Sequence, residues 1–365
     1  MDKVRRLRIV LALLTSTLIA TGIVMVYSTS ALYALEKTGH TWTMLARHLV
    51  AVLLGLAGAC WVMRVRLETV RRAAKPLLLG SWLLLGLVLI SSLGPSIGGA
   101  QRWLRLGPIS IQPSEIAQLT LVLYLADALT RKQGRLSEFW TGLAPLLLVV
   151  GMSVGFILLQ PDLGTAVAIT TVAAGLFFIS RVQWQHLMGL GLASVPALTV
   201  LLVSAGYRRQ RLAAFLNPWG DPQGAGFQII QSFLALGSGG LIGVGLGRST
   251  QKLFYLPGGY GDFIFAVIGE ELGLLGCTAV IALFIGVVWC GCSIALHAPD
   301  LFGRLLAMGL TLTLGLKALI NIGVATGLLP TKGLPLPFIS YGGSSLVVNL
   351  TSVGLLLNVA RAPRG

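Results

Sequence analysis

Apolar runs of about twenty residues recur along the chain and are separated by short polar breaks. A helix rises 1.5 Å per residue, so about twenty residues cross a hydrocarbon core of roughly 30 Å. The runs show no barrel-like alternation, and lipid offers the backbone no hydrogen-bond partners, so each run predicts a helix. The runs lie near residues 9–28, 44–63, 76–93, 115–130, 142–160, 164–180, 186–204, 264–293, 304–328 and 342–360. The pattern predicts an all-α, polytopic integral membrane protein with about ten transmembrane helices.

The composition agrees with this prediction, and the basic residues orient the helices. The chain of 365 residues is 55% hydrophobic and 11% charged, with a mean hydropathy of +0.85, outside the range of soluble domains. When about ten spans are threaded, the basic breaks fall on one side, which predicts cytoplasmic termini. The first run lacks a small-residue cleavage site, which predicts a retained signal-anchor helix in a single domain of residues 1–365. The orienting residues are Lys3, Arg5, Arg6, Arg8, Arg64, Arg66, Arg71, Arg72, Lys75, Arg131, Lys132, Arg135, Arg181, Arg304, Arg361 and Arg364.

The net charge of +15 does not indicate a partner made of nucleic acid. The basic residues are spread over membrane-flanking loops and do not gather into a domain that grips a duplex. The four cysteines, Cys60, Cys277, Cys290 and Cys292, lie inside or at the ends of apolar runs, and the histidines lie in separate breaks. This arrangement predicts buried thiols and neither a zinc site nor a disulfide framework.

The connection between the seventh and eighth runs, at about residues 205–262, is the longest in the chain and is predicted to face outward. Residues 227–236 form an apolar patch typical of a short surface or re-entrant helix. The loop also carries cations, which oppose the usual orientation rule. Two interpretations fit them: contact with lipid headgroups, or binding of an anionic substrate such as a pyrophosphate. These cations are Arg208, Arg209, Arg211, Arg248 and Lys252.

Two further outward segments have a similar composition. Residues 94–115 include Arg102 and enter the fourth run through Pro113 and Glu115, a typical helix start. Residues 326–345 combine prolines and glycines in an apolar setting, which excludes a continuous helix and predicts a re-entrant or surface loop.

Three acids mark the start of the eighth run. Asp262 follows a glycine-rich stretch, so it is either the N-cap of the eighth helix or a functional carboxylate. Glu270 and Glu271 lie deeper, where a charge costs roughly 2.5–3.5 kcal/mol, so they are predicted to face the bundle interior or to be paired. Eight residues of helix would separate Asp262 from Glu270 by about 12 Å, too far for a glycosidase-type pair at roughly 5–9.5 Å. An enzymatic interpretation therefore uses a single base.

Several stretches resemble signature sequences of the SEDS family (shape, elongation, division and sporulation), whose members include FtsW, RodA and SpoVE types. They are "AQRWLRLGPISIQPSE", "RRQRLAAFLNPWGDPQGAGFQIIQS", "GSGGLIGVGLGRSTQKLFYLP", "GDFIFAVIGEELG" and "NIGVATGLLPTKGLPLPFISYGGSSL". The resemblance covers nearly the whole chain, and "TKG" with "DLFGRLLAMG" is nearer the FtsW-like division branch. It implies a peptidoglycan glycosyltransferase that polymerises lipid II at the outer face of the bacterial cytoplasmic membrane, among membrane lipids and with a class B penicillin-binding protein.

The resemblance also implies site residues. The catalytic aspartate of the family falls on Asp262, and other motif positions fall on Arg102, Glu115, Arg208, Arg209, Arg211, Lys252, Ser340 and Ser344. Two departures put individual roles in doubt. The family usually has Glu and His shortly before the aspartate, where this chain reads Gly258 to Gly261, and Gln118 replaces a lysine.

These residues suit an inverting transfer in which Asp262 deprotonates or orients an acceptor hydroxyl. The outward cations, with a divalent ion such as Mg²⁺ or Mn²⁺ as a candidate cofactor, would stabilise the departing pyrophosphate. Two alternatives stay open: a lipid II flippase, and a non-catalytic scaffold for a class B penicillin-binding protein.

Overall fold

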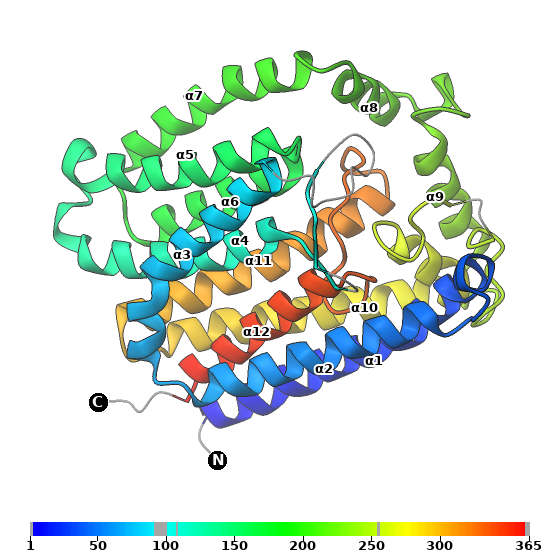
Figure 1. The fold of residues 1–365 in the computed structure, drawn as a ribbon, viewed down its shortest axis with the longest axis horizontal. Coiled ribbons are helices and arrows are strands. Elements are labelled where there is room, and N and C mark those ends of the chain that lie inside the picture. The colour runs from blue at the N-terminus through cyan, green and yellow to red at the C-terminus, as the bar shows by residue number, and fades with distance from the viewer. Residues whose placement is uncertain (1–2, 91–100, 107–108, 254–255, 362–365) are drawn as a thin grey trace.

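The protein is a bundle of long helices, with one short hairpin of two strands (Figure 1). The computed structural model describes residues 3–90, 101–106, 109–253 and 256–361. Residues 94–100 and 107–108 of the 94–115 segment, the end of the 76–93 run, residues 254–255 of the long loop and Arg364 lie outside these ranges.

The helices are α1 (Lys3–Thr38), α2 (Thr43–Arg64), α3 (Leu67–Ile90), α4 (Pro113–Arg131), α5 (Ala144–Leu159), α6 (Leu163–Ile179), α7 (Trp184–Val203), α8 (Gly206–Leu216), α9 (Phe227–Ser238), α10 (Ile264–Leu296), α11 (Leu301–Ala325) and α12 (Gly343–Val359). A π-helical turn at Phe139–Leu143 precedes α5, and 3₁₀ turns lie at Gln133–Arg135 and Pro218–Gly220. Strand β1 (Leu104–Leu106) pairs antiparallel with β2 (Ile109–Ile111), with Leu104 opposite Ile111.

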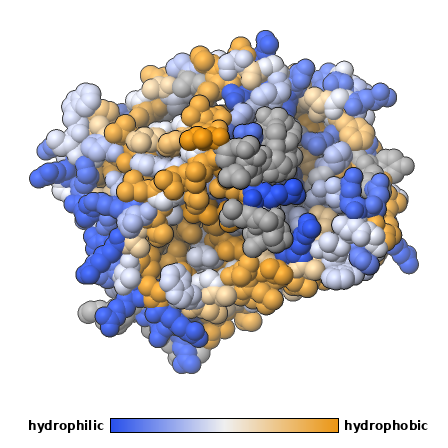
Figure 2. Space-filling view, in the orientation of Figure 1, coloured by the Kyte–Doolittle hydropathy of each residue, from blue (hydrophilic) through white to orange (hydrophobic). Residues whose placement is uncertain are grey.

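The helix pattern confirms the predicted all-α membrane fold. Among the described residues, seven helices are long and apolar enough to cross a membrane. Helices α4, α6 and α12 occupy the other predicted runs. An apolar belt lies between polar ends of the bundle on the face that Figure 2 shows. This belt is expected where the backbone is satisfied within helices and the side chains meet lipid.

The long loop contains two short helices, α8 and α9, at the end of the bundle away from the start of α1 and the end of α12 (Figure 1). The patch at 227–236, predicted to be helical, lies within α9. Helix α7, which leads into the loop, runs along the periphery of the bundle, and none of the described residues in its apolar window is buried (Figure 1).

The core forms where small residues let helices approach closely. Helix α2 packs along α12, and a Cβ added at Gly354 would lie 2.6 Å from the Cα of Ala59. Helix α1 covers the irregular segment before α12, because a Cβ at Gly22 would lie 2.4 Å from the carbonyl oxygen of Phe338. Residues 326–342, all described, contain no helix, as their prolines and glycines predict. Protein therefore shields this irregular backbone from lipid.

Candidate active site

The turn that carries Asp262 is held by the backbone carbonyls of residues 260–262, each of which accepts one hydrogen bond. The amide of Tyr341 donates to the first at 3.0 Å, and the hydroxyl of Ser340 donates to the second at 2.7 Å. The side-chain amide of Asn321, on α11, donates to the third at 2.9 Å. Donors from α11 and from the segment before α12 thus fix the backbone at Asp262.

The Asp262 side chain is not a helix cap. The N-cap position of α10 is Phe263, and no side-chain cap hydrogen bond forms there. Within the described ranges, no protein group donates a hydrogen bond to the half-buried carboxylate of Asp262. The N-cap interpretation is therefore wrong, and the carboxylate is available for another partner.

The Asp262 carboxylate faces the glycine of the "TKG" motif. A Cβ added at Gly333 would lie 2.7 Å from the Asp262 carboxylate oxygen Oδ2. The side chain of the preceding residue, Lys332, lies across the start of α6, because a Cβ at Gly164 would lie 1.6 Å from its Cε atom. At both glycines, any other residue would displace one of these charged side chains.

The start of α6 brings Asp162 and Arg102 to the same region. Asp162 caps α6, accepting hydrogen bonds from the Thr165 amide at 3.3 Å and from its hydroxyl at 2.8 Å. Arg102, just before β1, donates from Nε to the Gln160 carbonyl at 3.1 Å. Its Nη1 atom lies 4.0 Å from Oδ1 of Asp162. The segment before the hairpin is therefore docked on the connection between α5 and α6.

The electrostatics of this region favour a base that titrates near neutral pH. Burial raises the pKa of Asp262 to about 6; the charges of Arg211 and Arg102 partly oppose this rise, and that of Asp162 adds to it. Burial lowers the pKa of Lys332 to about 8, against the attraction of Asp162. Positive charges on Arg102, Arg211 and Arg208 lower the pKa of Lys332 further. A carboxylate and several cations therefore share one site.

The three predicted cations of α8 differ in exposure and in their contacts. Arg211 is exposed and is placed so that its charge acts on Asp262. Arg208 is half-buried, and its Nη1 donates to the carbonyl of Leu201 at 2.7 Å. Arg209 is exposed, and within the described ranges it makes no side-chain hydrogen bond or ion pair. The substrate contacts of all three stay predictions.

Two other predicted site residues are buried in ion pairs. Nζ of Lys252 lies 2.8 Å from Oε1 of Glu271, and Glu115 pairs with Lys317 inside the bundle. Each pairing satisfies a charge that would be costly if buried alone. A substrate contact by Lys252 or Glu115 stays a prediction, but in this structure their charged groups are already engaged by protein partners.

The two predicted serines make structural contacts. Ser340 holds the Asp262 turn, as described above, and accepts a hydrogen bond from the Leu336 amide at 2.8 Å. Ser344, at the start of α12, accepts from the Gln112 amide at 3.0 Å and donates to the Ser110 carbonyl at 3.1 Å. Ser344 thus joins the hairpin to α12, and substrate binding by either serine stays a prediction.

Three residues of the site were not singled out from the sequence: Asp162, Asn321 and Lys332. Lys332 lies in the "TKG" stretch, which from sequence alone indicates only a resemblance to the FtsW-like division branch. Asn321 and Asp162 carried a weaker signal, a polar residue next to an apolar run, which in a membrane protein suggests function or pairing.

The two departures from the family pattern have structural counterparts. Tyr260, in the glycine-rich stretch, packs between Tyr33 and Tyr341, with ring centroids 5.4 and 6.1 Å away. Gln118 is buried on α4, and its Nε2 atom has no hydrogen-bond partner among the described residues. The tyrosine cluster packs the stretch where the family usually has Glu and His.

Within the described ranges, no group of three or more His, Cys, Asp or Glu side chains is arranged to hold a metal ion. Asp162 is close enough to Asp262 for its charge to raise the pKa of Asp262. Two carboxylates suit a hard ion such as Mg²⁺ only if substrate phosphates complete its ligands.

Comparisons with known proteins identify the family of the chain. Residues 8–365 match the FtsW/RodA/SpoVE family, described as cell cycle proteins. The chain is 44% identical to a probable peptidoglycan glycosyltransferase FtsW of Geobacter metallireducens, over 100% of this chain and 97% of that protein. It is 42% identical to the stage V sporulation protein E of Bacillus subtilis, over 98% of this chain and 97% of that protein.

Two solved structures share the fold. One, from a study of how a peptidoglycan synthase complex coordinates polymerization and crosslinking, is 34% identical with a TM-score of 0.79, covering 96% of both chains. The rod shape determining protein RodA of Thermus thermophilus is 32% identical with a TM-score of 0.71, covering 96% of this chain and 95% of that one. Because the family match, the relatives and the fold all extend over nearly the full length, this chain belongs to the FtsW/RodA/SpoVE family of membrane proteins.

Proposed function

We propose that this protein is a peptidoglycan glycosyltransferase that polymerises lipid II into glycan strands. The observation that carries the proposal is the half-buried carboxylate of Asp262, which does not cap α10 and on which the charges of Arg102 and Arg211 act. A base and cations in one site suit a sugar transfer with a pyrophosphate leaving group. The relatives named as probable peptidoglycan glycosyltransferases support this substrate class.

Inversion at the sugar requires the acceptor 4-hydroxyl to attack the face opposite the pyrophosphate. Asp262 accepts the hydroxyl proton as the acceptor oxygen bonds to the anomeric carbon. The bond from that carbon to the pyrophosphate oxygen breaks, and the pyrophosphate leaves with the electron pair. Arg102, Arg211 and Lys332 stabilise the charge that develops on it. A divalent ion held by Asp162 and Asp262 would supply further charge neutralisation when bound.

The reaction is proposed to take place at the outer face of the bacterial cytoplasmic membrane, with both termini cytoplasmic. The basic residues that flank the spans near both termini support this orientation. A class B penicillin-binding protein is the proposed partner, supported by similarity to a structure from a study of a peptidoglycan synthase complex. Relatives named FtsW support a role in division rather than elongation.

Purified protein, with and without its cognate class B penicillin-binding protein, tests the proposal by lipid II polymerisation. Asp262→Ala is expected to lose 10²–10⁴-fold in rate, the usual range for a general base, while keeping its thermal unfolding temperature. Polymerisation by Asp262→Ala at the wild-type rate would reject the assignment. Movement of fluorescent lipid II across vesicles without polymer formation would favour a flippase. A scaffold would be favoured if the activity depends on the partner but is unchanged in Asp262→Ala.

A further inference from the structure

Helix α10 is broken a few turns after Asp262, and the long loop enters the break. Gly273 adopts φ 66° and ψ −164°, which no helix accommodates. The freed amides of residues 274–275 donate to the carbonyls of residues 240–241, at 2.9 and 3.1 Å. The freed carbonyls of residues 270–271 accept from the amides of residues 244–245, at 3.0 and 3.1 Å. The loop therefore satisfies backbone groups that would otherwise be costly at membrane depth.

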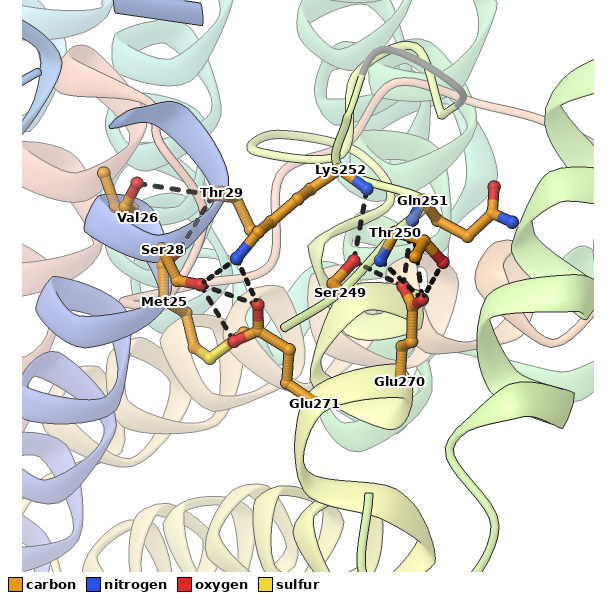
Figure 3. Close-up of polar contacts among 10 residues, drawn as sticks. All are labelled: Met25, Val26, Ser28, Thr29, Ser249, Thr250, Gln251, Lys252, Glu270 and Glu271. Atoms are coloured by element: carbon orange, nitrogen blue, oxygen red, sulfur yellow. Dashed lines mark hydrogen bonds and ion pairs between the residues drawn. The ribbon is translucent and has the colours of Figure 1, made fainter. Parts of the chain in front are cut away.

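The side chain of Glu270 binds the loop a second time, at residues 249–251 (Figure 3). Its carboxylate accepts from the amide and the hydroxyl of Thr250, both at 2.9 Å, and from the Ser249 hydroxyl. The Gln251 amide lies 3.4 Å from both carboxylate oxygens. Glu270 is 1% exposed, so these donors replace the water it lacks.

The side chain of Glu271 binds the next loop residue and a second helix (Figure 3). Its carboxylate receives Nζ of Lys252 at 2.8 Å and the hydroxyl of Ser28, on α1, at 2.7 Å. The side chain of Lys252 is 7% exposed and that of Glu271 is not exposed. Lys252 also donates to Ser28 at 3.0 Å. We call Glu270, Glu271, Ser28 and residues 249–252 the carboxylate clasp.

The clasp shortens the free part of the loop that ends at Asp262. Residues 249–252 are fixed to α10 by the clasp, and Asp262 is fixed by its position just before α10. Among the described residues that follow, the Leu256 amide donates to the Gln251 carbonyl at 2.9 Å, and the Phe263 amide donates to the Gly258 carbonyl at 3.2 Å. The first part of α10, the clasp and the Asp262 turn therefore form one unit.

We propose that Glu270 and Glu271 are positioning residues for Asp262, and that Lys252 serves as the buried counter-ion of Glu271 instead of as a ligand of the substrate. The inference rests on the proposed function of Asp262 as the base. A positioning role predicts that a broken clasp lowers kcat and leaves the KM for lipid II nearly unchanged. A phosphate-binding role for Lys252 predicts a higher KM.

Paired neutral substitutions separate these roles. Removing one partner of a buried ion pair leaves a lone buried charge, whereas replacing both is often neutral. Lys252→Met and Glu271→Gln are each expected to lose at least about tenfold in kcat, and the double variant is expected to regain most of that loss. A double variant as impaired as Lys252→Met would overturn the proposal. Lys37→Met, an exposed lysine on α1, is the matched control and is expected to match the wild type.

Hydrogen exchange tests the clasp without any activity. The amides of residues 244–245 donate to the backbone carbonyls of residues 270–271, and the amides of residues 250–251 donate to the Glu270 carboxylate. Because both sets flank the Lys252–Glu271 pair, they are expected to exchange faster in each single variant and to regain protection in the double variant. Unchanged exchange in the single variants would overturn the clasp even if they lose activity. If the wild type forms no polymer, the proposed function fails, and the exchange pattern still decides whether the clasp exists.

Discussion

The side-chain amide of Asn321 donates a hydrogen bond to the carbonyl oxygen of Asp262 at 2.9 Å. The same amide donates to the carbonyl of Leu334 at 2.8 Å. One buried side chain of α11 therefore joins the turn that carries the carboxylate to the segment that carries Lys332. A base works only when it is held within hydrogen-bonding reach of its proton, so this link bears directly on the role as base that we propose for Asp262.

Asn321→Leu is expected to lower kcat for lipid II polymerisation by about 10²-fold, the cost of a misplacement of roughly 1 Å. The physical reason is the loss of both hydrogen bonds at a site that leucine fills with similar volume. Steady-state kinetics on purified protein measures the effect. Thr311→Val is the control, since among the described residues the Thr311 hydroxyl bonds only within its own helix, at the Ala307 carbonyl. Equal activities of the two variants would remove Asn321 from the mechanism.

The rate is expected to rise with pH through about 6, because burial raises the pKa of Asp262 to that value. Only the deprotonated carboxylate accepts a proton, so activity is lost as the pH falls below the pKa and reaches a plateau above it. A profile of kcat/KM between about pH 4.5 and 7.5 locates this acidic limb, the pH range over which activity rises to the plateau. A limb near the ordinary aspartate value of about 4 would mean that Asp262 is not desolvated in the working enzyme.

The rate is expected to fall again above about pH 8, because burial and nearby arginines lower the pKa of Lys332 to that value. Lys332 is a cation below this pKa and is neutral above it, so the stabilisation of the leaving group that we propose for it would disappear at high pH. Lys332→Met is expected to be slower than the wild type and to lack the alkaline limb. An alkaline limb that persists in Lys332→Met would assign it to another group.

Gly333→Ala is expected to reduce kcat at least about tenfold, because its Cβ would meet the Asp262 carboxylate oxygen at 2.7 Å. The carboxylate must move, whereas the backbone of the segment need not. The control is Gly134→Ala, in the turn before the Phe139–Leu143 π-helical turn, where an added Cβ meets no atom within 4 Å. Polymerisation assays and thermal unfolding of both variants separate a displaced base from a misfolded protein.

The sequence by itself determined the membrane helices and the irregular segment before α12, but not the break of α10 at Gly273. An apolar run of about twenty residues has no stable alternative to a helix in lipid, and prolines with glycines between 326 and 342 exclude one. It also determined that Glu270 and Glu271 need partners, because lone charges at that depth are too costly.

Tertiary structure decided which side chains meet. Glu115 pairs with Lys317, which lies 202 positions later in the chain, and Lys252 turns to Glu271. Local sequence carries no information on such pairs, because they depend on which helix faces pack together. The same packing brings Arg102 and Asp162 near Asp262, where burial raises the pKa of Asp262, the charges of Arg211 and Arg102 oppose the rise, and the charge of Asp162 adds to it.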